Sequence, residues 1–209
     1  MLKVVEAVER FSHIGGHPAV DLVNTVHWRL DPARRSDRLV SMSDVLGWSQ
    51  ETDLLSDVEA DRLQGESQRH PRIAAAELAR TLRLRESIYD SLMGGQVADL
   101  ITDEYREAIG RARLARRPDD TWAWTEDSLG LHTPRHRLSR SVVDLFGSPA
   151  AAQVRQCQDD ACGWIFLDLS PRNNRRWCVS AECGNRNRVR RHYQRRSQQT
   201  DVQNQEDRP

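Results

Sequence analysis

Residues 157–183, CQDDACGWIFLDLSPRNNRRWCVSAEC, contain all four cysteines of the 209-residue chain. The cysteines form two pairs, each with four residues between its members, and fifteen residues separate the pairs. Two short-spaced pairs joined by a hairpin-length spacer can supply the four tetrahedral ligands that Zn²⁺ needs. Few apolar residues lie between 155 and 196, so metal binding must supply much of this segment's folding energy. We therefore predict one structural zinc ion per chain, bound by Cys157, Cys162, Cys178 and Cys183.

The alternative for these cysteines is two disulfides, or free thiols in a core. Clustered cysteines in a reducing compartment are more often metal ligands than disulfides. A complete four-thiolate shell leaves no position for water, which argues against a catalytic zinc. His13, His17 and His27 match no metalloenzyme motif, and we expect them at the surface or at helix caps. Because residues 1–150 show no nucleophile–base pair or phosphate-binding loop, we do not expect an enzyme.

The spacer between the cysteine pairs has the pattern of a β-hairpin. Trp164, Phe166 and Asp168 alternate with the aliphatic residues Ile165, Leu167 and Leu169. Residues 170–174 (SPRNN) supply a turn, and a return strand is expected through 176–178. After Cys183 the composition becomes helical. A knuckle, a β-hairpin and a C-terminal helix whose first turn supplies the last ligand make a treble-clef-like zinc module over residues 151–197.

Amphipathic patterns upstream predict a mainly α fold, with an α-helical domain over residues 10–150. A short buried helix or turn-helix is expected at 17–28, and helices are expected after an N-cap at Ser43 and at 56–68, 71–93, 102–117 and 134–146. Residues 29–38 read as an exposed loop, and 121–124 as a strand or hairpin. Gly147-Ser-Pro149 marks the boundary with the zinc module and is expected to be separable, and residues 198–209 are expected to be a disordered tail.

Charge is distributed unevenly although the chain has a net charge of zero. Residues 151–209 carry 11 arginines against 7 acidic residues, which leaves a net charge of −4 on residues 1–150. Residues 170–197 hold nine arginines and a single acid, Glu182. Because all basic residues except Lys3 are arginines, the clustering is more informative than the residue type.

In a helix after Cys183, Arg188, Arg191 and Arg195 would share one face, with Val189 and Tyr193 expected to pack on the hairpin. Like charges repel, and an anionic partner such as a phosphate backbone would offset that repulsion. The alternative is a merely solvated charged face. The candidate nucleic-acid contacts are Arg175, Arg176, Arg186, Arg188, Arg190, Arg191 and Arg195.

The N-terminus has no apolar core of signal-peptide length, and no stretch approaches the ~20 apolar residues that span a bilayer. We therefore expect a cytoplasmic protein without a membrane partner.

Two motifs resemble known families. The run from Cys157 through Cys162-Gly163-Trp164 to Cys183-Gly184-Asn185-Arg186 resembles the CGNR zinc finger, which takes its name from residues 183–186. Residues 21–25, Asp-Leu-Val-Asn-Thr, resemble the opening motif of the ABATE domain, which usually precedes that finger. The resemblance implies a bacterial stress-induced transcription regulator that binds double-stranded DNA through the finger.

By the same resemblance, the four cysteines are zinc ligands and Arg186 is the motif arginine. The helical domain would sense a small-molecule effector or form a homodimer. Asn24 and Thr25 either cap a helix or line a ligand pocket. An RNA-binding or protein-interaction module remains the alternative function, because treble clefs serve such partners as well.

Overall fold

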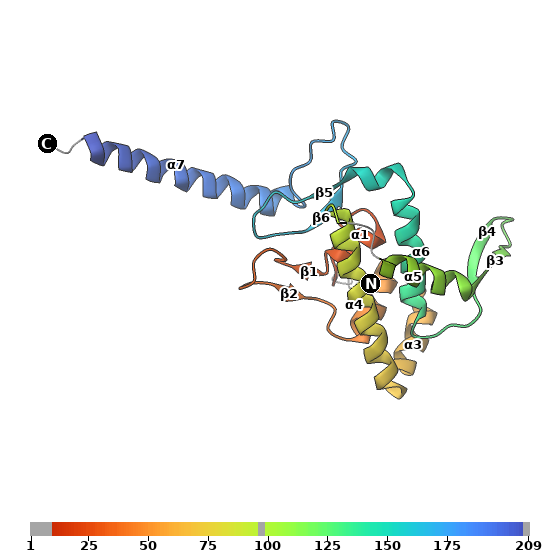
Figure 1. Cartoon of the computed structure of the whole chain (residues 1–209). Helices are drawn as coiled ribbons and strands as arrows, with labels where there is room; N and C mark the ends of the chain where they lie inside the picture. The colour runs from red at the N-terminus through yellow and green to blue at the C-terminus, as the bar shows by residue number, and fades with distance from the viewer. Residues whose placement is uncertain (1–9, 96–98, 207–209) are drawn as a thin grey trace, which may run out of the picture.

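The computed structural model describes residues 10–95 and 99–206, with side chains described through residue 196. The fold is mainly α, as predicted (Figure 1). The helices are α1 (Pro18–Val23), α2 (Met42–Glu51), α3 (Asp57–Arg69), α4 (Pro71–Leu92), α5 (Asp99–Gly110), α6 (Thr133–Phe146) and α7 (Asn185–Glu206). The described strands form antiparallel pairs: β1 (Val26–His27) with β2 (Ser36–Asp37), β3 (Ala112–Arg116) with β4 (Trp122–Glu126), and β5 (Val154–Gln156) with β6 (Ile165–Leu167). No helix in the described ranges is long and apolar enough to cross a bilayer.

The short helix α1 lies at the centre of the hydrophobic core. His17 caps its start by accepting a hydrogen bond from the Ala19 amide, and Pro18 occupies the first turn, where a missing N–H costs nothing. Every residue of α1 after Pro18 is buried, and the helix packs against α4, α6 and β6. The segment of the sequence that includes the ABATE-like motif therefore organises the core.

Several predicted helices agree closely with the structure. Helices α3, α4 and α6 occupy the expected segments, and Ser56 caps α3 through a capping box with Glu59. Helix α2 also forms, but its cap is Ser41 and not Ser43 as predicted. Ser41 forms a capping box with Asp44, whose carboxylate lies three residues further along. The predicted cap position was wrong because both serines are compatible with local preference, and only Ser41 has an acid at the third position.

The helix predicted over 102–117 is wrong at its C-terminal end. Helix α5 ends at Gly110, and the arginine-rich segment 112–116 forms strand β3. Its partner β4 overlaps the strand or hairpin predicted at 121–124, begins at Trp122 and ends at Glu126, and pairs in the register Leu114↔Trp124. Glycine disfavours helix continuation, and the tryptophan-rich strand provides a cross-strand partner. The helical periodicity of residues 102–117 carries no information about a partner strand.

Residues 29–38, predicted to be an exposed loop, connect and partly form the β1–β2 hairpin. Val26 pairs with Asp37 and His27 with Ser36. Arg29 is buried, and its guanidinium forms an ion pair with Glu86 of α4. The loop prediction was thus incomplete, because Arg29 is buried in an ion pair with a helix that is distant in the sequence, which a local pattern does not show.

The main hydrophobic core extends across the boundary predicted at 147–149. The chain there continues as a 3-10 turn, η1 (Pro149–Gln153), which packs on α6. Val154, Ile165 and Leu167 belong to the same buried cluster as the helices α1 to α6. The helical part and the zinc-module part therefore share one core, and the boundary in sequence is not a gap in packing.

Within the C-terminal module, the predicted hairpin has a different partner strand. Strand β6 pairs with β5, in the register Val154↔Leu167, and not with residues 176–178. The hairpin thus closes around the first cysteine pair, while the second pair follows an irregular segment and a π-helical turn, η2 (Ser180–Gly184). Alternation in the spacer identified one strand correctly but could not identify its partner.

Helix α7 begins directly after this turn and extends away from the body of the molecule (Figure 1). Because it runs to Glu206, most of the tail predicted to be disordered over 198–209 is helical. That tail contains no glycine, and its first proline is Pro209, so low apolar content alone did not prevent a helix. Residues 207–209 lie outside the described residues.

Candidate metal centre and nucleic-acid interface

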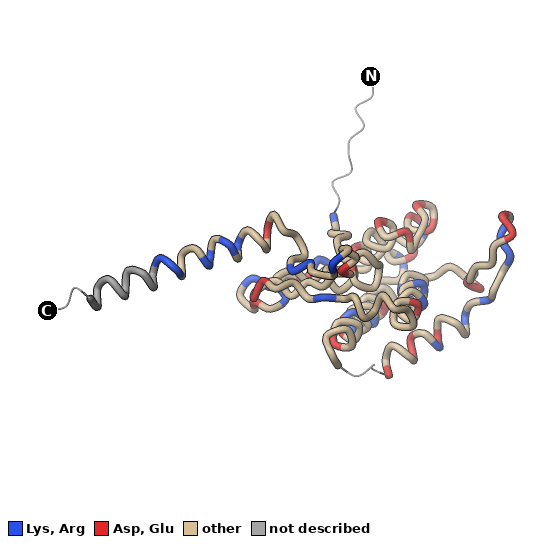
Figure 2. The backbone as a smooth tube through the Cα atoms, turned by 90° about the horizontal axis from the view of Figure 1, so that it is seen from above, with Lys and Arg blue, Asp and Glu red and all other residues tan. Residues whose placement is uncertain are grey.

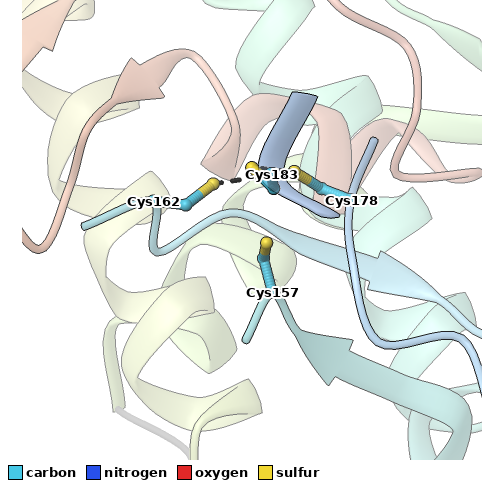
Figure 3. Close-up of side chains that lie close together, drawn as sticks. All are labelled: Cys157, Cys162, Cys178 and Cys183. Carbon is cyan, nitrogen blue, oxygen red and sulfur yellow. Dashed lines mark hydrogen bonds between the residues drawn. The ribbon is translucent and has the colours of Figure 1, made fainter. Parts of the chain in front are cut away.

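The four cysteines converge on one point (Figure 3). All are buried, none forms a disulfide, and their sulfur atoms lie within 4.8 Å of one another. The Sγ–Sγ distance is 3.6 Å between Cys162 and Cys178, and 3.4 Å between Cys178 and Cys183. A disulfide would need about 2 Å, whereas tetrahedral Zn–S bonds of about 2.3 Å place sulfurs about 3.8 Å apart. The four thiols therefore fit a zinc ion.

Local backbone structure places the first two sulfurs. Cys157 follows β5 and Cys162 precedes β6, so the two strands hold the ends of the knuckle. The Cys157 amide donates to the Trp164 carbonyl at 2.8 Å, and the Trp164 amide in turn hydrogen-bonds to the Cys162 sulfur. Gly163 has a φ of +71°, and a Cβ there would lie 2.8 Å from the Cβ of Arg29. Glycine is needed at this point for both its conformation and its size.

Crowding of the thiols favours a bound cation. Hydrogen bonds with Cys157 and then with Cys162 raise the pKa of the Cys178 thiol above its ordinary value. Four thiolates at this separation repel one another, so full deprotonation requires a positive charge at their centre. Zn²⁺ supplies that charge and accepts four sulfur ligands. These four residues would hold it.

Arg186, one of the predicted nucleic-acid contacts, lies beside the metal centre. Its Nη2 donates to the Cys183 sulfur at 2.8 Å, and its Nε donates to the Asp159 carboxylate at 3.0 Å. Its guanidinium also stacks on the Trp28 ring, 4.6 Å from the centroid. Groups that hydrogen-bond to metal ligands orient them and tune the site. Arg186 is therefore placed to support the cysteine cluster.

Three further predicted contacts also bind within the protein. Arg175 stacks on the Phe166 ring at 4.1 Å and donates to the carbonyl of Cys178 at 2.5 Å. Arg176 donates to the Gln158 side chain at 2.6 Å. Arg190 forms an ion pair of 2.5 Å with Asp160. Arg176 and Arg190 thus connect the irregular segment and α7 to the knuckle, whereas Arg175 connects the irregular segment to β6.

The remaining predicted contacts, Arg188, Arg191 and Arg195, behave differently. All are exposed, and none forms an ion pair among the described residues. Val189 and Tyr193 do not pack on the hairpin as predicted, since they are 47% and 64% exposed. The prediction was wrong because α7 leaves the module at its first turns and projects outward (Figure 2). Among the described side chains of α7, these three arginines thus carry positive charge without an ion-pair partner.

Asn24 lies where the ABATE-like motif (residues 21–25) contacts strand β6 of the finger. Its Nδ2 donates to the Ile165 carbonyl at 2.8 Å, and its Oδ1 accepts from the Ile165 amide at 2.9 Å. Asn24 is also the C-cap residue of α1. Thr25 donates to the Leu22 carbonyl at 2.7 Å and accepts from Arg85 at 3.1 Å. Both residues therefore make buried structural hydrogen bonds at the end of α1.

Asp21 completes this motif. Its carboxylate accepts a hydrogen bond of 2.8 Å from the Gly15 amide, and the Gly15 carbonyl accepts one of 2.9 Å from the Leu167 amide. Burial raises the pKa of Asp21 to about 6, partly offset by the Gly15 hydrogen bond. The sequence analysis assigned no role to this acid, and no local pattern shows that its partner Gly15 binds Leu167 of the finger. The motif therefore holds strand β6 at two points. Asp21 binds Gly15, which binds Leu167, and Asn24 binds Ile165.

Further hydrogen bonds connect the helical part of the chain to the finger. The Trp164 indole donates to the Val26 carbonyl at 3.0 Å, and the Arg29 amide donates to the Cys162 carbonyl at 2.9 Å. A cavity of about 360 Å³ lies beside these contacts and is lined by His27, Trp28, Trp164, Glu182 and Arg186, among others. Three of the cysteines also line it, so part of this volume is the metal position itself.

Comparison with known families agrees with both resemblances. The CGNR zinc finger model matches residues 153–196, which include the four cysteines. A model described as "Putative stress-induced transcription regulator", the ABATE model, matches residues 16–149. No curated protein matches the chain in sequence. Since the ABATE match covers more than half of the chain, the protein belongs to the ABATE family and carries a C-terminal CGNR zinc finger.

Proposed function

We propose that this protein is a transcription regulator that binds duplex DNA through the exposed arginine face of α7. The observation that carries the proposal is the set of three exposed arginines at i, i+3 and i+7 on that helix. Arg188, Arg191 and Arg195 have no ion-pair partner in the described part of the chain. Phosphates would neutralise a charge that the protein leaves uncompensated.

The zinc ion in this proposal has a structural role, with one ion per chain. Four thiolates complete its coordination, so no position remains for a catalytic water, and we assign no enzymatic activity. The metal would fix the N-terminal end of α7, because its ligand Cys183 lies immediately before that helix. Reduced thiols are required for this site, which is consistent with a cytoplasmic location.

The helical domain would pass a signal to the finger, either by binding a small-molecule effector or by forming a homodimer. The shared core supports such coupling, because a change in the position of α1 also moves its partner Ile165. The cavity beside Trp28 and Trp164 is lined by residues of both parts, including three of the cysteines, so an effector bound there would contact the finger as well as the helical domain. Asn24 and Thr25 are not among the residues that line it.

The test is duplex binding by full-length, zinc-loaded protein measured over a range of salt concentrations. With four to six phosphate contacts, the log–log salt slope should lie at about −4 to −5. The variant R188Q/R191Q/R195Q should weaken binding to all duplex sequences and flatten the slope by about three units. Its matched control, R62Q/R72Q/R113Q, removes three exposed arginines of α3, α4 and β3 that form no ion pair with the described residues, and it should behave as wild type.

Two results would contradict the proposal. Equal duplex affinity for the α7 variant and the control, with zinc and helicity retained, would show that the arginine face is only solvated. Tighter binding of RNA hairpins than of duplex DNA would instead favour the RNA-binding alternative. Metal analysis of the same samples should give about one zinc per chain, and zinc-free protein with paired cysteines would contradict the metal assignment.

A further inference from the structure

We propose that the β1–β2 hairpin of the ABATE part is a second DNA-contacting element, in which Arg35 and Arg38 bind duplex phosphates alongside α7. This inference rests on the proposed function and extends its interface beyond the finger. It assigns a role to a hairpin that the family matches leave without one.

The ion pairs of the hairpin leave these two arginines uncompensated. Residues 26–38 contain four arginines and two aspartates. The pairs are Arg29 with Glu86, Arg34 with Asp31 at 2.6 Å, and Arg85 with Asp37 at 2.6 Å. Arg35 and Arg38 are exposed and form no ion pair within the described ranges. The hairpin therefore presents two positive charges to solvent.

The hairpin is held at a fixed position relative to the root of α7. The guanidinium of Arg34 lies 4.0 Å from the centroid of the Trp28 ring, and that of Arg186 lies 4.6 Å from it. Trp28 thus connects an arginine of the hairpin with an arginine of the finger. Its φ of 52° is rare for a residue with a side chain and persists only where surrounding contacts enforce it.

Backbone and ion-pair contacts reinforce this position. The Arg29 amide donates to the Cys162 carbonyl at 2.9 Å, which fastens the hairpin to the zinc knuckle. On the other strand, the two hydrogen bonds between Arg85 and the Asp37 carboxylate fasten β2 to α4. A ligand bound by both elements would therefore meet a preformed spacing, which lowers the entropic cost of binding.

Arg38 lies close to the joint with the finger. The Arg38 amide donates to the Thr25 carbonyl at 2.9 Å, which places Arg38 next to strand β1. Burial lowers the pKa of His27 in that strand, and the positive charge of Arg38 lowers it further. His27 in turn contacts the Trp164 ring edge-on, at 4.9 Å between centroids. The charge of Arg38 therefore belongs to the same surface region as the zinc module.

The overall shape allows both elements to meet one partner. Figure 1 shows that α7 and the β1–β2 hairpin extend from the same side of the body, whereas the β3–β4 hairpin extends from the opposite side. A duplex presents phosphates on two strands, so two basic elements on one side of a protein can contact it together. This arrangement favours duplex DNA over a small anion as the partner.

The experiment compares R35Q/R38Q with the control R62Q/R72Q in the full-length, zinc-loaded protein. Arg62 and Arg72 are also exposed and unpaired, but they lie on α3 and at the start of α4, away from α7. The probe is a labelled mixed-sequence duplex. We expect R35Q/R38Q to weaken binding and to flatten the log–log salt slope by about two units. The control should match wild type, and R35K/R38K should restore the slope because it keeps the charge.

The outcomes separate this inference from the proposed function. If wild type binds and R188Q/R191Q/R195Q is impaired while R35Q/R38Q matches its control, the hairpin is not a contact and the α7 interface stands. If wild type does not bind duplex at all, both proposals fail. Zinc content and helicity of R35Q/R38Q are measured as a check on its folding. If either is lost, the single variant R35Q, at the exposed end of the hairpin loop, replaces the double variant, and its salt slope should flatten by about one unit.

Discussion

The side-chain amide of Asn24 pairs with both backbone groups of Ile165, a residue 141 positions away in the chain. Its two hydrogen bonds, of 2.8 and 2.9 Å, imitate the pairing of a neighbouring strand along β6. On the opposite edge, Ile165 pairs with Gln156 of β5. A single amide at the end of α1 therefore completes the strand that follows the zinc knuckle, and it connects the two family segments.

Replacing Asn24 with alanine should destabilise the whole protein. The change leaves the amide and the carbonyl of Ile165 buried without partners, at about 1–3 kcal/mol each. We expect the free energy of unfolding, measured in urea, to fall by about 2–6 kcal/mol. Asn174→Ala, at an exposed position, serves as control. A loss no larger than that of the control would show that the double hydrogen bond contributes nothing.

A fragment of residues 1–150 should not fold to a native core. It lacks Val154, Ile165 and Leu167, which pack in the same cluster as α1 and α6. The fragment would expose the apolar surface that these residues cover, and we expect dye binding and poor amide dispersion in NMR spectra. Full-length protein should unfold in one transition. A well-dispersed spectrum from the fragment would instead support the separable boundary that the sequence suggests.

Arg186→Gln should weaken zinc retention, in contrast to Arg188→Gln. Arg186 donates to the Cys183 sulfur, whereas Arg188 is exposed. Loss of a residue that supports a metal ligand typically costs 10–100-fold in metal affinity, and we expect about that loss here. Competition with a chromogenic chelator measures it. Equal zinc affinity in the two variants would show that Arg186 does not support the metal site.

Asp21→Asn should stabilise the protein at neutral pH but not at acid pH. The pKa of Asp21 is raised to about 6 in the folded state, so the folded protein binds more protons than the unfolded chain between roughly pH 4 and pH 6. The stabilising contribution of this group is therefore complete below its unfolded pKa and is lost as the pH rises through about 6. Asparagine retains an acceptor for the Gly15 amide without the buried charge.

The expected gain from Asp21→Asn is about 3 kcal/mol at pH 7, and it should become small near pH 4. Urea titrations of both proteins at several pH values give the difference directly. Asp61→Asn, on the exposed face of α3, provides a control that should show no such dependence. A difference that is constant with pH, or that grows toward acid, would contradict the assignment of a buried, charged Asp21.

Local patterns were sufficient for much of the fold. Apolar periodicity located α4 at 71–93, and the helix expected at 56–68 agrees with α3, which Ser56 caps. Where two local patterns competed, as in residues 111–117, the helix prediction was wrong because β4 offers a partner that helical periodicity does not consider. Prediction from sequence was therefore reliable where a segment's own residues decide its structure.

The sequence by itself determined the cysteine cluster, since ligand spacing is a property of the local chain, and it identified both family segments. Only the tertiary structure decided that β6 pairs with β5, that Arg186 supports Cys183, and that Asn24 binds Ile165. Each of these depends on which segments meet in space. Hydrogen bonds act over about 3 Å whatever the separation along the chain, so a local pattern can show that a residue needs a partner but cannot show which residue it is.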